Sequence, residues 1–330
     1  MSRPLIHLVT PARAADNNGN WQTAARWARL LRSTADCRIA GDWTGTEPGP
    51  LPDGLIALHA RRSAGAVARW RAAHPGRPLG LVLTGTDLYK DLPAGDPQAL
   101  RSLDLADRLL LLQPEALQAL PAAHRARADV CWQSTTPRRT LPKTSRHLRA
   151  LVVGHLRAEK APELIFALAE LLAERQDLFI DHLGAPLDPA LGAQAQALAA
   201  RCPRYRWLGA RPHGETRQRI QRAHLLIHPS HMEGGAHVVM EAVCSGTPVL
   251  ASRVSGNVGM LGEDWPGYFA PGDADSLRLA LVALRDEPAR LATLQARAEA
   301  LAPRFLPGHE QACLRNWLGR LGLAEAPGCA

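Results

Sequence analysis

The sequence predicts an α/β protein of two domains, each built on a parallel sheet with helices on both faces. Short apolar runs alternate with helical runs along the whole chain, as is typical of parallel strands joined by crossover helices. The length of 330 residues suits two domains of ordinary size, each with an ample core. A polar stretch with two prolines, residues 134–147, predicts the linker between them.

The first half opens with an apolar run at 4–10, which predicts a buried parallel strand. A loop rich in Asn and Gly leads from it into a helix at 21–32 with an apolar stripe. The loop lacks the GxGxxG spacing, so it does not predict a dinucleotide fingerprint. Further runs predict strands at 37–40, 55–59, 79–84, 109–112 and 129–132, and helices at 62–73 and 114–120.

The turn after the strand at 79–84 carries Gly85, Thr86 and Asp87. Open α/β sheets place their ligands beyond the carboxyl ends of strands. Asp87 is therefore a candidate catalytic residue that would orient a sugar or an acceptor group. Its alternative role is to cap the turn.

The second half restarts with an apolar run at 148–153, which predicts the first strand of the second sheet. The same alternation continues to the end of the chain. It predicts strands at 178–183, 205–208, 225–227 and 249–251, and helices at 160–175, 189–200, 215–223, 236–244, 273–285, 288–300 and 308–321.

Residues 228–252 are the stretch around which a functional site is predicted. A strand enters it, a turn with Gly234 and Gly235 follows, and a helix begins near Ala236. These small residues leave the backbone accessible at the N-terminus of the helix. Unpaired N–H groups and the positive end of the helix dipole suit a diphosphate there.

Two carboxylates frame this turn. Glu233 precedes the helix mouth, and Glu241 lies eight positions later. At about 1.5 Å rise per residue, a helical interval of that size spans on the order of 12 Å, about the length of a nucleotide diphosphate. Glu241 can accept hydrogen bonds from two vicinal ribose hydroxyls, as carboxylates do in other nucleotide folds. Glu233 would lie nearer the transferred group and is a candidate catalytic residue.

This stretch resembles the Glu-x7-Glu signature of retaining glycosyltransferases of family 4. The positions in register are Pro229, Ser230, Glu233, Gly234, Glu241, Ala242, Gly246, Pro248 and Val249. The resemblance implies a GT-B architecture of two Rossmann-like domains facing a cleft. Residues 1–147 would form the acceptor domain and residues 148–304 the UDP-sugar donor domain. Residues 305–330 would form a C-terminal helix that packs back on the first domain.

A second segment, 154–161, is similar to the family pattern GRLxxxKG, whose Arg and Lys clamp the donor diphosphate. The matches are Gly154, Leu156 and Lys160, and the departures are His155 for Arg and Ala161 for Gly. The resemblance makes Lys160 catalytic and donor-binding, with His155 and Arg157 also at the donor. Lys160 is one of three lysines in a chain with 36 arginines, so lysine is an informative choice here. Arg211, after the strand at 205–208, would lie on the side of the base.

Four segments together resemble the selenosugar synthases of selenoneine biosynthesis, a branch of this family: NNGNWQTAARWARLL, TGTDLY, VVGHLRAEK and HPSHMEGGAHVVMEA. This implies that selenophosphate attacks the anomeric carbon of UDP-N-acetylglucosamine or UDP-glucose, giving a selenosugar, UDP and phosphate. An anionic nucleophile needs no strong general base. The candidate acceptor residues are Asn17, Asn18, Gly19, Asn20 and His237; a plain turn with an Asn cap is the alternative for Gly19 and Asn20. The alternative acceptor is a carbohydrate or lipid hydroxyl.

The composition of the chain bears on other classes of function. The net charge of +8 and pI near 9.7 admit a nucleic-acid partner, but the arginines are dispersed, which favours a solvated basic surface and no nucleic-acid partner. A non-catalytic sugar-nucleotide sensor also remains open. The six cysteines form no CxxC pair, and no apolar run reaches the ~20 residues of a membrane span. With no signal peptide apparent, we expect a cytoplasmic protein with reduced thiols.

A metal site is also considered, because several ligand-type residues lie close together in the central stretch. They are His228, His231, Glu233 and His237. The spacing HxxHxE across a Pro-Ser turn differs from HExxH on a helix, so the side chains need not converge. We expect neither a metal nor a resident cofactor, with the UDP-sugar acting as a substrate. The oligomeric state is not predicted.

Overall fold

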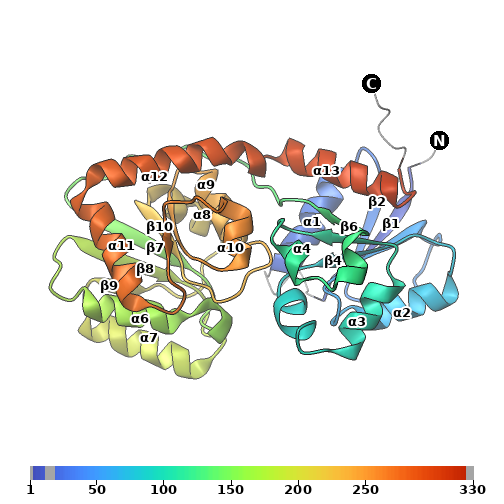
Figure 1. Cartoon of the computed structure of the whole chain (residues 1–330), viewed down its shortest axis with the longest axis horizontal. Coiled ribbons are helices and arrows are strands. Elements are labelled where there is room, and N and C mark those ends of the chain that lie inside the picture. Colours follow the sequence, from blue (N-terminus) through green and yellow to red (C-terminus); the bar gives the residue numbers. More distant parts are fainter. Residues whose placement is uncertain (1–2, 12–18, 325–330) are drawn as a thin grey trace. The chain divides into compact units, whose positions relative to one another are not determined.

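The computed structural model describes residues 3–11 and 19–324, and the chain divides into two compact units (Figure 1). The first unit comprises Met1–Ser134 and Pro307–Ala330, and the second comprises Thr135–Leu306. The sequence placed the first boundary at 147, which lies inside the second unit. Residues after Ser134 hydrogen-bond to that unit; the backbone N–H of Arg138, for example, donates to Cys244 O at 2.9 Å.

The first unit holds a six-stranded parallel sheet in the order β2-β1-β3-β4-β5-β6. Its strands are β1 Leu5–Val9, β2 Asp36–Ala40, β3 Gly54–Leu58, β4 Leu79–Leu83, β5 Arg108–Leu111 and β6 Ala128–Val130. The central strands β3 and β4 are buried along their whole length, as expected where helices cover both faces. The helices are α1 Gly19–Leu31, α2 Ala64–Ala73, η2 Asp87–Asp91, α3 Pro97–Leu105, α4 Ala116–Ala119, α5 Ala122–Arg125 and α13 Pro307–Arg320.

Helix α13 belongs to the core of the first unit. Its Trp317 packs in one apolar cluster with Trp27 of α1 and with residues of β1, β3 and β4. A Cβ on Gly80 of β4 would lie only 2.6 Å from Cη2 of Trp317, so glycine permits the close approach of this helix to the sheet. A second cluster, around Trp43 and Trp70, fills the remaining core.

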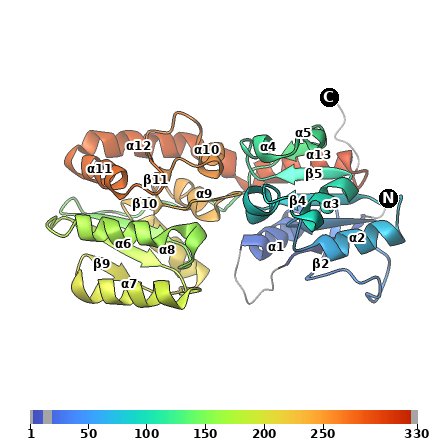
Figure 2. The ribbon, with the colours of Figure 1, turned by 60° about the horizontal axis from the view of Figure 1, so that its bottom comes forward.

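The second unit holds another six-stranded parallel sheet, in the order β12-β11-β10-β7-β8-β9. Its strands are β7 Leu148–Val153, β8 Leu178–Leu183, β9 Tyr205–Trp207, β10 Leu225–His228, β11 Val249–Ser252 and β12 Tyr268–Phe269. Helices α6 and α7 pack side by side (Figure 2). The helices are η3 Ala158–Lys160, α6 Pro162–Leu171, α7 Pro189–Arg201, α8 His213–Arg222, α9 His237–Val243, α10 Ser255–Leu261, α11 Ala274–Asp286, α12 Pro288–Leu301 and η4 Ala302–Phe305.

The structure confirms the strands predicted at 148–153 and 178–183 and adds elements that the sequence analysis missed. Helix α3 has clear local signals, because Asp96 accepts hydrogen bonds from the N–H groups of Gln98 and Ala99 and proline occupies the first turn. Helix α10 has weak ones, since it contains two glycines. The π-helical turn η2 follows β4, where only a turn was expected. Among the described residues, no helix is long and apolar enough to cross a membrane.

Candidate active site

Two loops leave the carboxyl edge of the second sheet next to each other. Strands β7 and β10 are parallel neighbours, so the segments that follow them, 154–160 and 229–236, start side by side. The backbone N–H of His231 donates to Glu159 O at 3.0 Å and joins the two loops. This edge is where open α/β sheets place their ligands.

Glu233 lies at the meeting point of these loops. Its Oε1 forms an ion pair with Lys160 Nζ and lies 3.2 Å from His228 Nε2. The side chains of Glu233 and Lys160 are 10% and 21% exposed, so the pair is shielded but remains open to a ligand. The structure thus brings together Glu233, which was predicted as catalytic, and Lys160, which was predicted as catalytic and donor-binding.

The charge state of this cluster follows from burial and neighbouring charge. Burial raises the pKa of Glu233, but the charge of Lys160 and the hydrogen bond from His228 outweigh it and hold that pKa well below its usual value. Burial lowers the pKa of His228, despite the adjacent carboxylate. At neutral pH the Glu233 carboxylate is therefore ionised and the His228 imidazole is neutral.

Close backbone packing fixes the position of Glu233. A Cβ on Gly256, in the first turn of α10, would lie 1.9 Å from Glu233 O. A Cβ on Gly184, after β8, would lie 1.8 Å from Gly154 O at the start of the other loop. Both glycines are required for close approach of one segment to another. Neither glycine was predicted from the sequence, because such an approach leaves no local pattern.

Glu241 lies on α9 and is held by two side chains of α8. His213 Nε2 donates to Glu241 Oε1 at 2.6 Å, and Arg217 Nη1 lies 3.8 Å from the same oxygen. Arg217 also donates to Thr135 Oγ1 and to Thr136 O. The Glu241 side chain is 9% exposed. His213 and Arg217 were missed, because their contact with Glu241 joins two helices that are separated by a strand.

The residue that replaces the family arginine does not restore its charge. His155 Nδ1 accepts a hydrogen bond from the Ala185 N–H at 3.1 Å. Burial lowers the pKa of His155, and the charges of Arg157 and Lys160 lower it further, so the ring is neutral at pH 7. Arg157 keeps its guanidinium about half-exposed, 3.9 Å from Glu159. The next departure, Ala161, adopts a left-handed conformation with φ of 47°.

The helix mouth differs in one respect from the sequence-based expectation. Helix α9 begins at His237, and within the described part of the chain no side chain caps its N-terminus at Ala236. Gly234 and Gly235 therefore precede the helix, and the interval from Glu233 to Glu241 is helical only in its second part. The rise of 1.5 Å per residue does not apply throughout that interval.

Arg211 was the candidate on the side of the base. Its Nε lies 3.6 Å from Glu215 Oε1, one turn further along, and its side chain is 39% exposed. The carboxylate thus engages Arg211 while leaving it accessible. A contact between Arg211 and the base stays a prediction.

In the first unit, the geometry of Asp87 favours the capping alternative. Its carboxylate is fully buried. It accepts hydrogen bonds at 2.8–3.0 Å from the backbone N–H groups of Ala60, Thr84, Gly85 and Leu88. The backbone thus occupies this carboxylate from several directions, as the capping role requires, and the catalytic role of Asp87 stays a prediction.

Two of the four acceptor candidates in the first unit lie among the described residues. Gly19 and Asn20 form the first residues of α1. Asn17 and Asn18 lie outside the described residues. The remaining candidate, His237, belongs to the second unit, at the start of α9.

Comparison with known families identifies the second unit. Residues 134–299 match the family model described as "Glycosyl transferases group 1". The match covers half of the chain and contains both loops of the candidate site. The chain belongs to the group 1 glycosyltransferases. Lys160, Glu233 and Glu241 therefore lie within the part that defines its membership.

Curated relatives of this glycosyltransferase include D-inositol 3-phosphate glycosyltransferases. The protein from Thermobispora bispora is 32% identical over 176 residues, which cover 50% of this chain and 41% of that protein. The one from Corynebacterium diphtheriae is 35% identical over 111 residues, covering 32% and 26%. The aligned part thus spans less than half the length of these relatives.

Solved structures resemble nearly the whole chain. Anabaena Alr3699/HepE, in complex with UDP and glucose, matches with a TM-score of 0.76 at 16% identity, covering 96% of this chain and 100% of that one. Sucrose-phosphate synthase from Thermosynechococcus elongatus matches with a TM-score of 0.76 at 15% identity, covering 97% and 99%. At such low identity the likeness shows the fold alone, and it confirms the predicted α/β, GT-B class with two parallel sheets.

Proposed function

We propose that this chain is an enzyme that transfers a sugar from a UDP-sugar donor. The observation that carries the proposal is the Lys160–Glu233 ion pair at the carboxyl edge of the second sheet, inside the family match at 134–299. Further support comes from the fold neighbour Alr3699/HepE, which was solved with UDP and glucose.

Lys160 would act on the leaving group. Without a donor, its charge is balanced by Glu233. A diphosphate entering beside it would share the ammonium group, and negative charge would grow on UDP as the bond to the anomeric carbon breaks. Neutralising that charge is the main electrostatic task in such a transfer. Arg157, half-exposed on the same loop, is the nearest further cation in sequence.

The two carboxylates would recognise hydroxyl groups. Glu233 is kept ionised by its neighbours, so it can only accept hydrogen bonds, as sugar hydroxyls require. Glu241 would accept from the ribose hydroxyls. A carboxylate offers about four lone-pair directions, so its contact with His213 leaves capacity for a ligand.

For the acceptor we infer selenophosphate, which would give a selenosugar as made in selenoneine biosynthesis. Selenium would attack the anomeric carbon and form the C–Se bond, while the C–O bond to the diphosphate breaks and UDP leaves with the electron pair. Water would then cleave the P–Se bond and release phosphate. The support is the resemblance of the four sequence segments, together with the depressed pKa of Glu233, which makes it a weak base suited to an anionic nucleophile.

A hydroxyl acceptor is the second candidate, and the curated relatives favour it. Their name describes glycosyl transfer to D-inositol 3-phosphate. A hydroxyl must lose its proton during the transfer, which an anionic selenium nucleophile need not do. The acceptor therefore decides between the two candidates.

The experiment is UDP release from UDP-N-acetylglucosamine and UDP-glucose, with and without selenophosphate, followed by the mass of the product. A parallel reaction offers D-inositol 3-phosphate. Release that requires selenophosphate, with a selenium-bearing sugar as product, is the expected result. UDP release with D-inositol 3-phosphate but not with selenophosphate would show that the acceptor is a hydroxyl, and the UDP-sugar would remain the donor. Tight UDP binding without release under any condition would leave a sugar-nucleotide sensor.

A further inference from the structure

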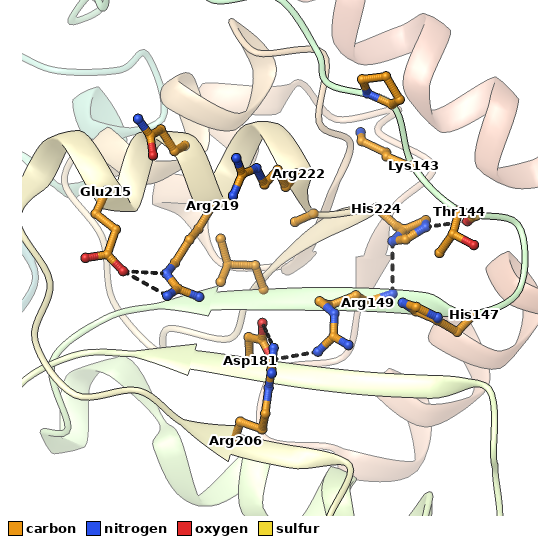
Figure 3. A pocket seen from close by; sticks show the side chains of 14 residues that line it. Lys143, Thr144, His147, Arg149, Asp181, Arg206, Glu215, Arg219, Arg222 and His224 are labelled. Carbon is orange, nitrogen blue, oxygen red and sulfur yellow. Dashed lines mark hydrogen bonds and ion pairs between the residues drawn. The ribbon is translucent and has the colours of Figure 1, made fainter.

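The second unit contains a pocket beneath helix α8 (Figure 3). Strands β7, β8 and β9 contribute to its floor, α8 forms one wall, and residues 142–147 lie at one end. Its volume is about 500 Å³, within the ~300–1,000 Å³ of small-molecule sites. We call it the α8 pocket, defined by Lys143, Arg149, Asp181, Arg206, Arg219 and Arg222. Among the described residues, its lining includes none of Lys160, Glu233 and Glu241.

Positive charge dominates the lining of the α8 pocket. Five cationic side chains face two carboxylates. Asp181 is shared by Arg149 and Arg206, at 3.0 Å and 2.7 Å. Glu215 pairs with Arg219 at 2.8 Å. The two carboxylates therefore leave an excess of positive charge in a concave space.

Part of this charge is held in place before any ligand arrives. Arg206 donates to both carboxylate oxygens of Asp181, at 2.8 Å and 2.7 Å. The Arg149 guanidinium donates to the same carboxylate and stands 4.8 Å from the ring centroid of Phe179. The Asp181 side chain is 6% exposed, so these contacts are shielded from water. Cations fixed in this way lose little freedom on binding an anion.

The other part has no carboxylate within ion-pair distance among the described residues. Within residues 3–11 and 19–324, the structure gives the side chains of Lys143 and Arg222 no ion pair or hydrogen bond. Burial lowers the pKa of Lys143 to about 8, and Glu299 offsets this only in part. A partly buried ammonium group without a partner is unfavourable, and an anion in the pocket would relieve that cost.

From this arrangement we propose that the α8 pocket binds a small anion with two or more linked phosphate groups. The cations come from the segment at 142–147, two strands and one helix, so they surround a space larger than one phosphate needs. Guanidinium groups match phosphate oxygens in pairs, and lysine adds a point charge. The inference does not depend on the proposed glycosyl transfer.

The probe is sodium tripolyphosphate, titrated by calorimetry at fixed ionic strength, with sulfate as the salt control. Because the candidate donor site also suits a diphosphate, the titration is repeated on Lys160→Ala. The pocket variant is Lys143→Met with Arg222→Gln. Its matched control is Arg290→Gln with Arg201→Gln, which removes two charges from exposed ion pairs of α12 and α7 outside the pocket. Arg222 is exposed, so Arg222→Glu alone serves if the double variant does not fold.

We expect saturable binding that persists in Lys160→Ala, weakens at least ~10-fold in the pocket variant and stays unchanged in the matched control. Loss of binding in Lys160→Ala would assign the anion to the donor site and overturn the proposal. Equal weakening in the control would reduce it to a general charge effect. If an oligonucleotide bound to the pocket and tripolyphosphate did not, the ligand would be a nucleic acid and the proposal of a small anion would be wrong.

Discussion

At the scale of single residues, Glu233 depends on two neighbours for its charge. Lys160 and His228 come from different segments, and they outweigh the effect of burial on the Glu233 carboxyl. The Lys160–Glu233 ion pair therefore holds both side chains in place, since neither charged group is fully solvated. A ligand that approaches Lys160 must also interact with the carboxylate beside it.

Lys160→Ala is expected to lower kcat/KM for UDP release by on the order of 10²–10³, because the leaving diphosphate loses its cation. The measurement is steady-state UDP release with either UDP-sugar. Lys90→Ala is the matched control, because Lys90 is an exposed lysine of the first unit and its removal should leave the rate unchanged. Near-normal turnover in Lys160→Ala would remove this residue from the site.

His182 gives the protein a predictable response to acid. It is buried on β8 beside the hydroxyl of Tyr205, and burial lowers its pKa to about 4. The unfolded chain takes up this proton near pH 6.5, whereas the folded chain does so only near pH 4. Stability from the neutral ring is therefore present above pH 6.5 and lost progressively as the pH falls toward 4, by about 3 kcal/mol.

The measurement compares denaturant unfolding at pH 7 and pH 4.5 for the protein and for His182→Gln. The substitution carries its own packing cost, so the informative quantity is the difference between the two pH values. That difference should be smaller in the variant. Identical pH dependence in both proteins would show that His182 does not control it.

At the scale of elements, helix α13 is attached to the first unit through one buried carboxylate. Glu310 is fully buried and accepts hydrogen bonds from Arg26 Nε at 2.8 Å and Trp27 Nε1 at 2.7 Å. The backbone N–H of Ser134 donates to it at 2.9 Å. A single residue thus connects α13, α1 and the end of the first segment of this unit.

Glu310→Ala should destabilise the first unit by about 3–5 kcal/mol, because it leaves the buried Arg26 without a partner. Thermal and denaturant unfolding measure the loss. Arg315→Ala, on the exposed side of the same helix, removes contacts with Ser33 and Thr34 and should cost less than about 1 kcal/mol. Similar losses in both variants would contradict an anchoring role for Glu310.

Helix α10 positions the backbone of Glu233 through Gly256. A methyl group at Gly256 cannot fit 1.9 Å from a carbonyl oxygen, so the loop or the helix must move. Gly256→Ala should therefore reduce UDP release at least ~10-fold, since small misplacements of a reacting geometry have large effects. Gly76→Ala, where the added atom meets nothing within 4 Å, is the control. Unchanged release in Gly256→Ala would show that the site tolerates the shift.

At the scale of the whole molecule, the chain carries a net charge of +8 and divides into two units. In the second unit, arginines pair with carboxylates at many points, and the α8 pocket concentrates the excess charge. The candidate donor residues belong to this same unit. A UDP ligand should therefore act first on the stability of residues 135–306.

UDP at about a hundredfold of its dissociation constant should raise the free energy of unfolding of the second unit by about 2.7 kcal/mol. Hydrogen exchange locates the effect, and we expect protection at 154–161 and 228–243. Uridine, which lacks the diphosphate, should protect much less. Protection confined to residues 19–134 would place the nucleotide outside the candidate site.

The sequence alone determined the class of fold and the order of most elements. Apolar alternation is local, so the strands at 148–153 and 178–183 could be found from the chain itself. The same holds for the loops that carry Lys160 and Glu233, because motifs and turns are written in consecutive residues. Even α3 could have been predicted, since Asp96 and the proline after it are ordinary helix-start signals.

The tertiary structure decided which residues meet. The contacts of Glu310 with Arg26, of His213 with Glu241 and of Gly256 with Glu233 all join segments that are distant along the chain. It also placed the Asp87 carboxylate within hydrogen-bond distance of several backbone N–H groups. Burial and the choice of hydrogen-bond partner depend on how elements pack, and a local pattern carries no record of that packing.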